Sequence, residues 1–224
     1  PRAHVAFRAR RGGPGPGAAL DVTTDDGRCS LRCEGTEYAT ARHRDAPLPP
    51  PRYLDVAGLG AGCAEPVPLA ELDAWRRASG ITYGPAYRAI RSARRGPGRI
   101  LAVVRTGDDT TCAPAFVPPP LLDSVFQALG LLDAGAAGAC LPWYVGRITT
   151  RRRITGTVLA LVEREAGGEP ANGAVRGRAT VCNQQGEVLL ELDRITLKSA
   201  APPAPAPRPA PPTPPGATGG GGPG

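Results

Sequence analysis

The sequence predicts an α+β fold in which an antiparallel sheet wraps around one central helix and a disordered tail follows. Residues 121–132 (LLDSVFQALGLL) place apolar side chains at the 3.6-residue period of a helix. Four later stretches have the apolar and β-branched character of strands, at residues 143–148, 154–163, 174–182 and 188–197. Residues 199–224 are almost wholly Pro, Ala and Gly, a composition that cannot bury a core. Taken alone, this pattern supports several α+β sheets equally.

The first 68 residues are expected to form strands and then a connector. Strand-like runs occupy residues 4–8, 19–23, 28–32 and 38–43. Asp25-Asp26-Gly27 is a turn signal between two of them, so residues 1–44 indicate an antiparallel meander. Residues 45–68 are rich in Pro and Gly but lack the strand–turn–helix context and the Lys-Ser/Thr of a phosphate-binding loop. They are interpreted as a connector.

The main folded region is expected over residues 69–198. It begins with a short helix at residues 69–79, which Gly80 can cap, and continues with a strand at residues 99–106. Pro118–Pro120 precede the central helix, where proline suits the first helical positions.

The basic charge of the chain does not indicate a nucleic-acid partner. The sequence holds 27 Lys+Arg and 20 Asp+Glu, a formal net charge of +7, and Lys198 is its only lysine. So strong an arginine bias, with abundant Ala, Gly and Pro, is typical of a GC-rich genome, and we interpret it as solvated surface. A nucleic-acid footprint would need clustered basic residues interleaved with stacking aromatics. The arginine runs at residues 8–11 and 151–153 have only Phe7 beside them.

The cysteines and the hydropathy pattern favour a protein of the reducing cytoplasm. None of the six cysteines forms a CxxC pair and the chain has two histidines, so no zinc site is expected. Cys29 and Cys33 would be neighbours on one strand, a poor placement for a disulfide, and we expect free thiols. No signal peptide or membrane-spanning run is present, so no membrane partner is expected. The chain starts at Pro1 and contains no methionine, and we expect it to be a piece of a longer polypeptide.

Four stretches of the sequence resemble one known family. Residues 80–90 (GITYGPAYRAI) resemble its Y-G-P-x-F-x-x-L segment, and residues 119–127 (PPLLDSVFQ) resemble its H-P-x-L-L-D-x-x-x-Q segment. Residues 141–146 (LPWYVG) and 192–197 (LDRITL) resemble the stretch after the helix and the closing strand. In this order the four resemble the C-terminal part of the dehydratase domains of bacterial type I polyketide synthases. The residues of these stretches are also similar to those of the iterative synthases of enediyne producers.

The resemblance implies a double hot-dog fold that is incomplete at its N-terminus. In this family two hot-dog units, each a curved antiparallel sheet around a helix, are fused in one chain. Residues 1–44 would then be the last strands of the first hot dog and residues 45–68 the connector. Residues 69–198 would form the second hot dog, and residues 199–224 an interdomain linker.

The resemblance also implies a chemistry, the removal of water from a 3-hydroxyacyl group held on the phosphopantetheine arm of an acyl carrier protein. In the family a His of the first hot dog and an Asp of the second share the proton transfers. Asp123 matches that Asp, and Gln127, one helical turn on and so on the same face, matches the glutamine that supports it. Tyr83 matches the tyrosine beside the substrate and is followed by Gly84 and Pro85, a fixed turn, and the resemblance implies that these three residues form the substrate-binding segment.

Further expectations concern the surroundings of the site. Burial should raise the pKa of Asp123 while the helix N-terminus should lower it. The resemblance implies no bound cofactor. It implies carrier protein and neighbouring synthase domains as partners, within a homodimeric parent synthase, and an arginine-rich surface could steer an acidic carrier protein.

Two departures from the family leave alternatives open. Neither His4 nor His43 stands in the family's H-x-x-x-G-x-x-x-x-P pattern, so both are interpreted as strand or loop residues. The catalytic His is expected upstream of Pro1, and the chain alone is expected to be inactive. Pro118 stands where the family has His. A non-catalytic dehydratase-like scaffold and a product-template domain, which catalyses cyclisation on a hot-dog fold, are therefore the alternatives.

Overall fold

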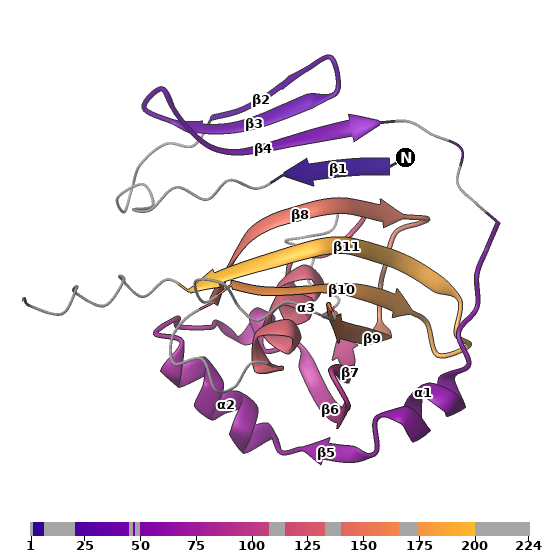
Figure 1. Ribbon diagram of the computed structural model, residues 1–224. Coiled ribbons are helices and arrows are strands. Elements are labelled where there is room, and N and C mark those ends of the chain that lie inside the picture. The colour runs from indigo at the N-terminus through magenta and orange to yellow at the C-terminus, as the bar shows by residue number, and fades with distance from the viewer. Residues whose placement is uncertain are drawn as a thin grey trace, which may run out of the picture.

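An antiparallel sheet of 11 strands organises the part of the chain that the computed structural model describes. That part comprises residues 2–6, 21–44, 47, 50–107, 115–132, 140–165 and 174–199. The strand order is β2-β3-β4-β1-β8-β11-β10-β9-β7-β6-β5 (Figure 1). The tail expected to be disordered lies outside the described residues, apart from Ser199 at the end of the last strand.

The first four strands form the meander that the sequence predicts. They are β1 (Arg2–Ala6), β2 (Asp21–Asp25), β3 (Arg28–Cys33) and β4 (Thr36–Arg44). Asp26 and Gly27 join β2 to β3 with φ angles of 41° and 68°, the left-handed pair that a tight hairpin turn needs. β1 pairs with β4 and also with β8, where Ala3 lies opposite Ile148. The meander therefore continues into the second part of the sheet.

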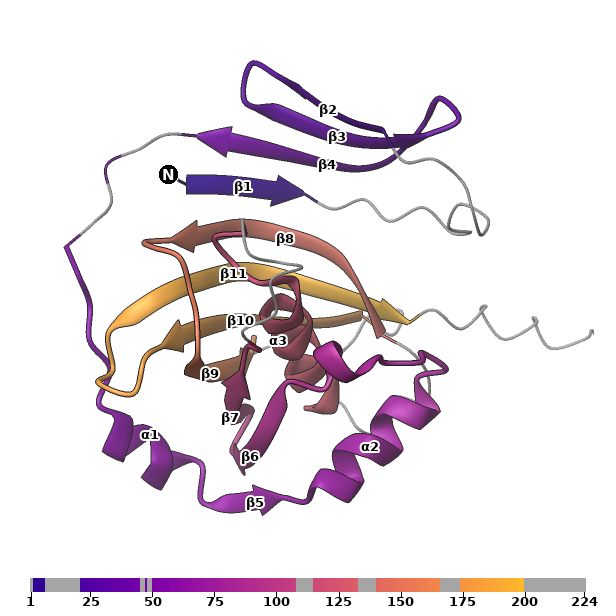
Figure 2. The same ribbon diagram turned by 180° about the vertical axis from the view of Figure 1, so that it is seen from behind.

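The remaining strands curve around one helix. They are β6 (Ile90–Gly96), β7 (Arg99–Arg105), β8 (Cys140–Thr150), β9 (Thr157–Arg164), β10 (Ala174–Cys182) and β11 (Val188–Ser199). Helix α3 (Pro119–Leu131) lies in the hollow of this curve, as Figures 1 and 2 show from opposite sides. The main hydrophobic core joins α3 to β7, β8, β9, β10 and β11. This is the hot-dog arrangement, and the predicted fold class is confirmed.

Residues 45–68 are more than the connector that their composition suggested. They contain a short helix, α1 (Val56–Gly62), and an edge strand, β5 (Glu65–Val67). The glycines of α1 and Pro66 in β5 are residues that argue against a helix and a strand. Proline is tolerated at a sheet edge, and Pro66 lies at such an edge, opposite Arg94 of β6. β6 was also missed, since its three arginines break the apolar alternation of a half-buried strand.

The prolines before α3 start the helix as expected. Pro118 is the N-cap in an extended conformation (φ −60°, ψ 131°), and Pro119 and Pro120 take the first two helical positions. The Pro118 carbonyl accepts hydrogen bonds from the amides of Leu121 and Leu122, at 3.0 and 3.3 Å. Pro118 therefore starts α3 with regular geometry.

Helix α2 (Leu69–Ala78) covers α3 from the side away from the meander (Figure 2). Its last turn is followed by Gly80 at φ 69°, the left-handed conformation that often ends a helix. Trp75 of α2 packs on Gly130 of α3 so closely that a Cβ atom at Gly130 would lie 2.5 Å from Cζ2 of the indole. Trp75 is thus part of the core, whereas Trp143 is partly exposed and lies under Lys198, whose Nζ is 3.9 Å from the ring centroid.

Two further features concern the cysteines and the length of the helices. Five cysteines are free thiols, namely Cys29, Cys33, Cys63, Cys140 and Cys182, while Cys112 lies outside the described residues. Among the helices of the described residues, none has both the length and the apolar character needed to cross a lipid bilayer.

The contact between Trp75 and Gly130 predicts opposite effects for two glycine-to-alanine changes. Alanine normally stabilises a helix interior relative to glycine by about 0.5–1 kcal/mol. Gly130→Ala should instead lower the free energy of unfolding by about 1–3 kcal/mol, because the new methyl group overlaps the indole ring. Gly60→Ala in α1 is the matched control, since no atom lies within 4 Å of its added Cβ. Urea denaturation followed by circular dichroism measures both, and an equal response would contradict the packing described.

Candidate active site on helix α3

Helix α3 is a buried helix with two polar side chains on one face. Eight of its 13 residues are buried, which accounts for its nearly continuous apolar sequence. Asp123 and Gln127 are one turn apart, so both side chains project on the same side of the helix. Gln127 is only 1% exposed, whereas Asp123 is half-buried. A carboxyl group and an amide are thus held together at the edge of the core.

The side-chain amide of Gln127 makes three hydrogen bonds. Its Nε2 donates to Oδ2 of Asp123 at 2.5 Å and to the carbonyl of Tyr87 at 3.0 Å. Its Oε1 accepts from Nε of Arg76 at 2.9 Å. Buried polar groups need such partners, and two acceptors at Nε2 with a donor at Oε1 leave this amide one orientation. The structure therefore brings the two predicted residues, Asp123 and Gln127, into direct contact.

The environment of Asp123 favours its protonated form. Burial raises the pKa of this carboxyl above its ordinary value of 3.8, because the charged form loses its hydration. The hydrogen bond from Gln127 and the positive charge of Arg76 act in the opposite direction, and burial outweighs them. Burial thus raises the pKa of Asp123 as expected, and the two groups that lower it are the Gln127 amide and the Arg76 guanidinium.

Tyr83 lies on the same side of the site. Burial and the charge of Asp123 raise the pKa of its phenol, while a hydrogen bond with Ser79 and the charge of Arg76 lower it. The guanidinium carbon of Arg76 is 6.0 Å from the centroid of the Tyr83 ring. Tyr83, which the sequence singled out, is therefore close enough to Asp123 to feel its charge.

Gly84 and Pro85 form the turn after Tyr83 and are exposed. Pro85 opens the 3₁₀ turn η1 (Pro85–Tyr87), and the carbonyl of Gly84 accepts the Tyr87 amide at 3.0 Å. This turn presents the Tyr87 carbonyl to Gln127. The two residues thus act here through the backbone, as the expected fixed turn.

Arg76 belongs to the site, although the sequence did not point to it. It lies on α2, is 7% exposed, and bonds Gln127 through Nε and Asp73 through Nη1 at 3.0 Å. The helical period of α2 marks Leu69, Leu72 and Trp75. Arg76 follows Leu72 by four residues and so shares its face, but its charge suggested a surface position. Only the packing of α2 against α3 shows that this side chain turns inward.

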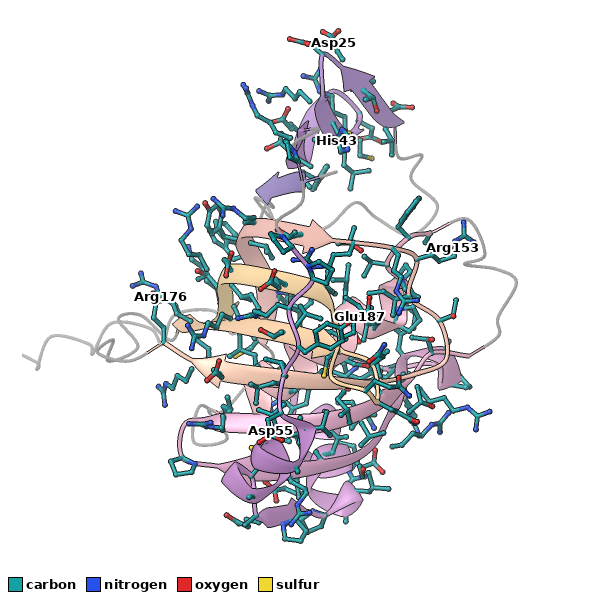
Figure 3. All side chains as sticks on the ribbon, turned by 90° about the vertical axis from the view of Figure 1, so that its right-hand side faces the viewer. Asp25, His43, Asp55, Arg153, Arg176 and Glu187 are labelled. Carbon is teal, nitrogen blue, oxygen red and sulfur yellow. The ribbon has the colours of Figure 1, made fainter. Side chains whose placement is uncertain are left out.

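The histidines lie apart from Asp123 in the fold. His43 is exposed on β4, among the outer strands in Figure 3, and the side chain of His4 lies outside the described residues. Within the described ranges, His, Cys, Asp and Glu side chains form no group of three that could hold a metal ion. The described chemistry of the site is that of a carboxyl group, an amide, a phenol and a guanidinium.

Comparison with known proteins decides the family. Residues 54–207 match the family described as the polyketide synthase dehydratase N-terminal domain. The chain belongs to this dehydratase family. The match spans the region that contains Tyr83, Asp123 and Gln127, so the resemblance to polyketide synthase dehydratase domains is confirmed.

Relatives in sequence and structure agree with this assignment. Polyketide synthase ThaG of Burkholderia thailandensis is 33% identical over 132 residues, which are 58% of this chain and 2% of that protein. The dehydratase domain of the CurK module of curacin polyketide synthase superposes with a TM-score of 0.72 at 18% identity. The dehydratase domain of RzxB from Pseudomonas fluorescens gives 0.73 at 17% identity. Each superposition covers 88% of this chain and 75% of the solved chain, and these two show the shared fold.

The raised pKa of Asp123 predicts a pH-dependent benefit from Asp123→Asn. Below pH 3.8 the carboxyl is protonated in both the folded and the unfolded state, and it adds no pH dependence. As pH rises through the raised folded pKa, the folded state must ionise a partly buried group, so stability is lost. Asparagine carries no charge, so the stability of the variant relative to the native chain should grow as pH rises above the ordinary pKa of 3.8 and level off above the folded pKa. Urea denaturation at a series of pH values measures this, and a constant difference would contradict the burial effect.

Proposed function

We propose that this chain supplies the acid half of a dehydratase site that acts on a 3-hydroxyacyl thioester. A base removes the proton on C2, Asp123 protonates the hydroxyl on C3, the C3–O bond breaks, and a C2=C3 double bond and one water form. The proton of Asp123 leaves with the water, and the proton from C2 remains on the base. Proton transfer by positioned groups of this kind contributes roughly 10²–10⁴-fold to a rate.

One observation carries the proposal: the half-buried carboxyl of Asp123 is held on one side by Gln127 and has a raised pKa. A general acid needs a carboxyl that keeps its proton to higher pH than an ordinary carboxyl does, and burial shifts the pKa of Asp123 in that direction. Because Gln127 donates to Oδ2, the acidic proton is directed to Oδ1. After transfer, the same hydrogen bond stabilises the carboxylate.

The other site residues fit supporting roles. Tyr83, next to Asp123, is placed to contact the acyl group beside its reacting carbons. Gly84 and Pro85 hold the turn that carries Tyr83 and presents the Tyr87 carbonyl to Gln127. No cofactor enters the proposed reaction, since proton transfers alone balance it.

We assign the base to a histidine of a first hot-dog unit that is not within this chain. Three facts support this assignment: His43 is exposed on β4, the chain matches three quarters of the solved dehydratase chains, and β1–β4 extend the sheet of the second unit at β8. The chain is therefore proposed to be the C-terminal part of a dehydratase domain. Its partners would be the carrier protein whose phosphopantetheine arm brings the substrate and the neighbouring synthase domains of a homodimeric, cytoplasmic enzyme.

The alternatives suggested by Pro118 gain no support from its position. Pro118 caps α3 in regular geometry, and Asp123 still meets Gln127 one turn apart. A scaffold that only holds the acyl chain, or a cyclase, therefore remains an outcome for experiment to detect.

Dehydration of a 3-hydroxyacyl pantetheine thioester tests the proposal. The substrate is incubated with this chain and with a longer polypeptide that adds the upstream hot dog, and mass spectrometry follows the loss of one water. We expect only the longer polypeptide to be active, and Asp123→Asn within it to lower the rate by at least about 100-fold. Asp55→Asn is the matched control, because Asp55 is an exposed aspartate at the start of α1 that makes no capping bond (Figure 3).

Each contrary result points to a different function. Thioester binding without loss of water would overturn the dehydratase proposal in favour of a scaffold. A ring-closed product that retains the expected oxygen atoms would indicate a cyclase. Full activity of Asp123→Asn in the longer polypeptide would remove Asp123 from the reaction.

A further inference from the structure

Arg76 connects helix α2 to the proposed acid through one chain of hydrogen bonds. Asp73 accepts from Nη1 of Arg76, Nε of Arg76 donates to Gln127, and Gln127 donates to Asp123. The Arg76–Gln127 bond joins residues 51 positions apart in the sequence and is buried. The position of α2 is therefore transmitted to the carboxyl of Asp123 through two side chains.

Three partners together fix which way the Gln127 amide faces, and Arg76 is the one that bonds its oxygen. Tyr87 presents a carbonyl oxygen and Asp123 a carboxyl oxygen, and both accept from Nε2. A rotated amide would place Oε1 against these acceptors and its NH₂ group against the Nε–H of Arg76. Arg76 allows only a hydrogen-bond acceptor at its position, so it penalises the rotated amide directly. An apolar residue in its place would leave that choice to the other two partners.

Burying the charge of Arg76 lowers the stability of the fold, which indicates that the residue serves the site. A buried charge needs both a counter-ion and full hydrogen bonding. Its counter-ion, Asp73, has a side chain that is 44% exposed, and Nη2 is buried without a hydrogen-bond partner among the described residues. A leucine or methionine could fill the same space against α3 without that cost. Stability alone therefore does not account for the arginine.

We propose that Arg76 is a positioning residue of the dehydratase site, which locks the Gln127 amide towards Asp123 and sets a positive charge behind the carboxyl. This inference rests on the proposed role of Asp123 as the acid. Arg76 acts through Gln127 and not on the substrate. Its removal should thus alter the orientation and the acidity of Asp123 while substrate binding is largely kept.

The charges around Asp123 give the direction of the effect. Arg76 faces it from α2 and Tyr83 from the loop after α2, while Asp73 lies on the far side of Arg76. Without the guanidinium, the pKa of Asp123 rises further, because burial is then opposed by the Gln127 bond alone. Removal of the Asp73 charge should have the opposite effect, because the Arg76 charge is then no longer partly neutralised.

NMR of the 224-residue chain tests the inference without any enzyme assay. The side-chain amide signals of Gln127, assigned by their loss in Gln127→Glu, are followed across pH and report the protonation of Asp123. We expect Arg76→Met to move the titration midpoint to higher pH, because the guanidinium that lowers the pKa of Asp123 is gone. Asp73→Asn should move the midpoint to lower pH. Arg77→Met, at the exposed neighbouring position, is the control and should leave the midpoint unchanged.

Kinetics of the longer polypeptide supply the second readout. Arg76→Met should lower kcat roughly 10–100-fold with little change in KM, as expected when a reacting group is misplaced. The high-pH limb of the rate profile, which reports the acid, should move to higher pH. Arg76→Lys keeps the charge and should return the high-pH limb towards its native position.

The results separate this inference from the proposed function. An unchanged midpoint in both Arg76→Met and Asp73→Asn would overturn the role of Arg76, whatever the activity. If the midpoints shift as expected but the native longer polypeptide never dehydrates, the positioning of Asp123 stands and the dehydratase function fails. Asp73 is partly exposed, so Asp73→Asn keeps the test decisive even if Arg76→Met does not fold.

Discussion

Helix α3 is enclosed by the sheet and by α2, so each polar atom on it must find its partner inside the protein. This requirement shapes the site. Ser124 turns its hydroxyl back to the Pro120 carbonyl at 2.7 Å, which satisfies it locally. Gln127 cannot do the same and draws on Asp123 of its own helix and on two other segments of the chain, α2 and η1. Asp123 lies at the margin of the core, bonded to this network and half-buried.

The sheet meets the same requirement by bringing its backbone close to the helix. Gly177 of β10 faces Leu129 of α3, and a Cβ atom there would overlap both the leucine side chain and the carbonyl of Glu163. The helix therefore rests almost on the backbone of the strands, and its position depends on main-chain hydrogen bonds more than on adjustable side chains. Such a support suits a site in which small displacements of a proton donor change the rate.

Local sequence patterns predicted the parts of the protein that depend on local rules. The alternation along Ala174–Cys182 gave the bounds of β10 correctly, and the spacing of Asp123 and Gln127 was enough to place them on one face. Where tertiary contacts decide, local patterns were insufficient. β6 turns its arginines outward and buries only Ile90 and Ala93, so it shows little strand periodicity. Arg76 looks like any surface arginine of a short helix until α2 is docked on α3.

The fit between α2 and α3 has a consequence for chimeric synthases. Trp75 needs a glycine at position 130, and Arg76 needs an amide at position 127, so adjacent residues of one helix each specify a residue of the other. A graft that exchanges α3 alone would disrupt both contacts. A larger residue at position 130 would overlap Trp75, and the loss of the amide at position 127 would leave the buried Arg76 without its acceptor. Transplants between dehydratases should thus take the stretch from residue 69 to residue 131 as a single cassette.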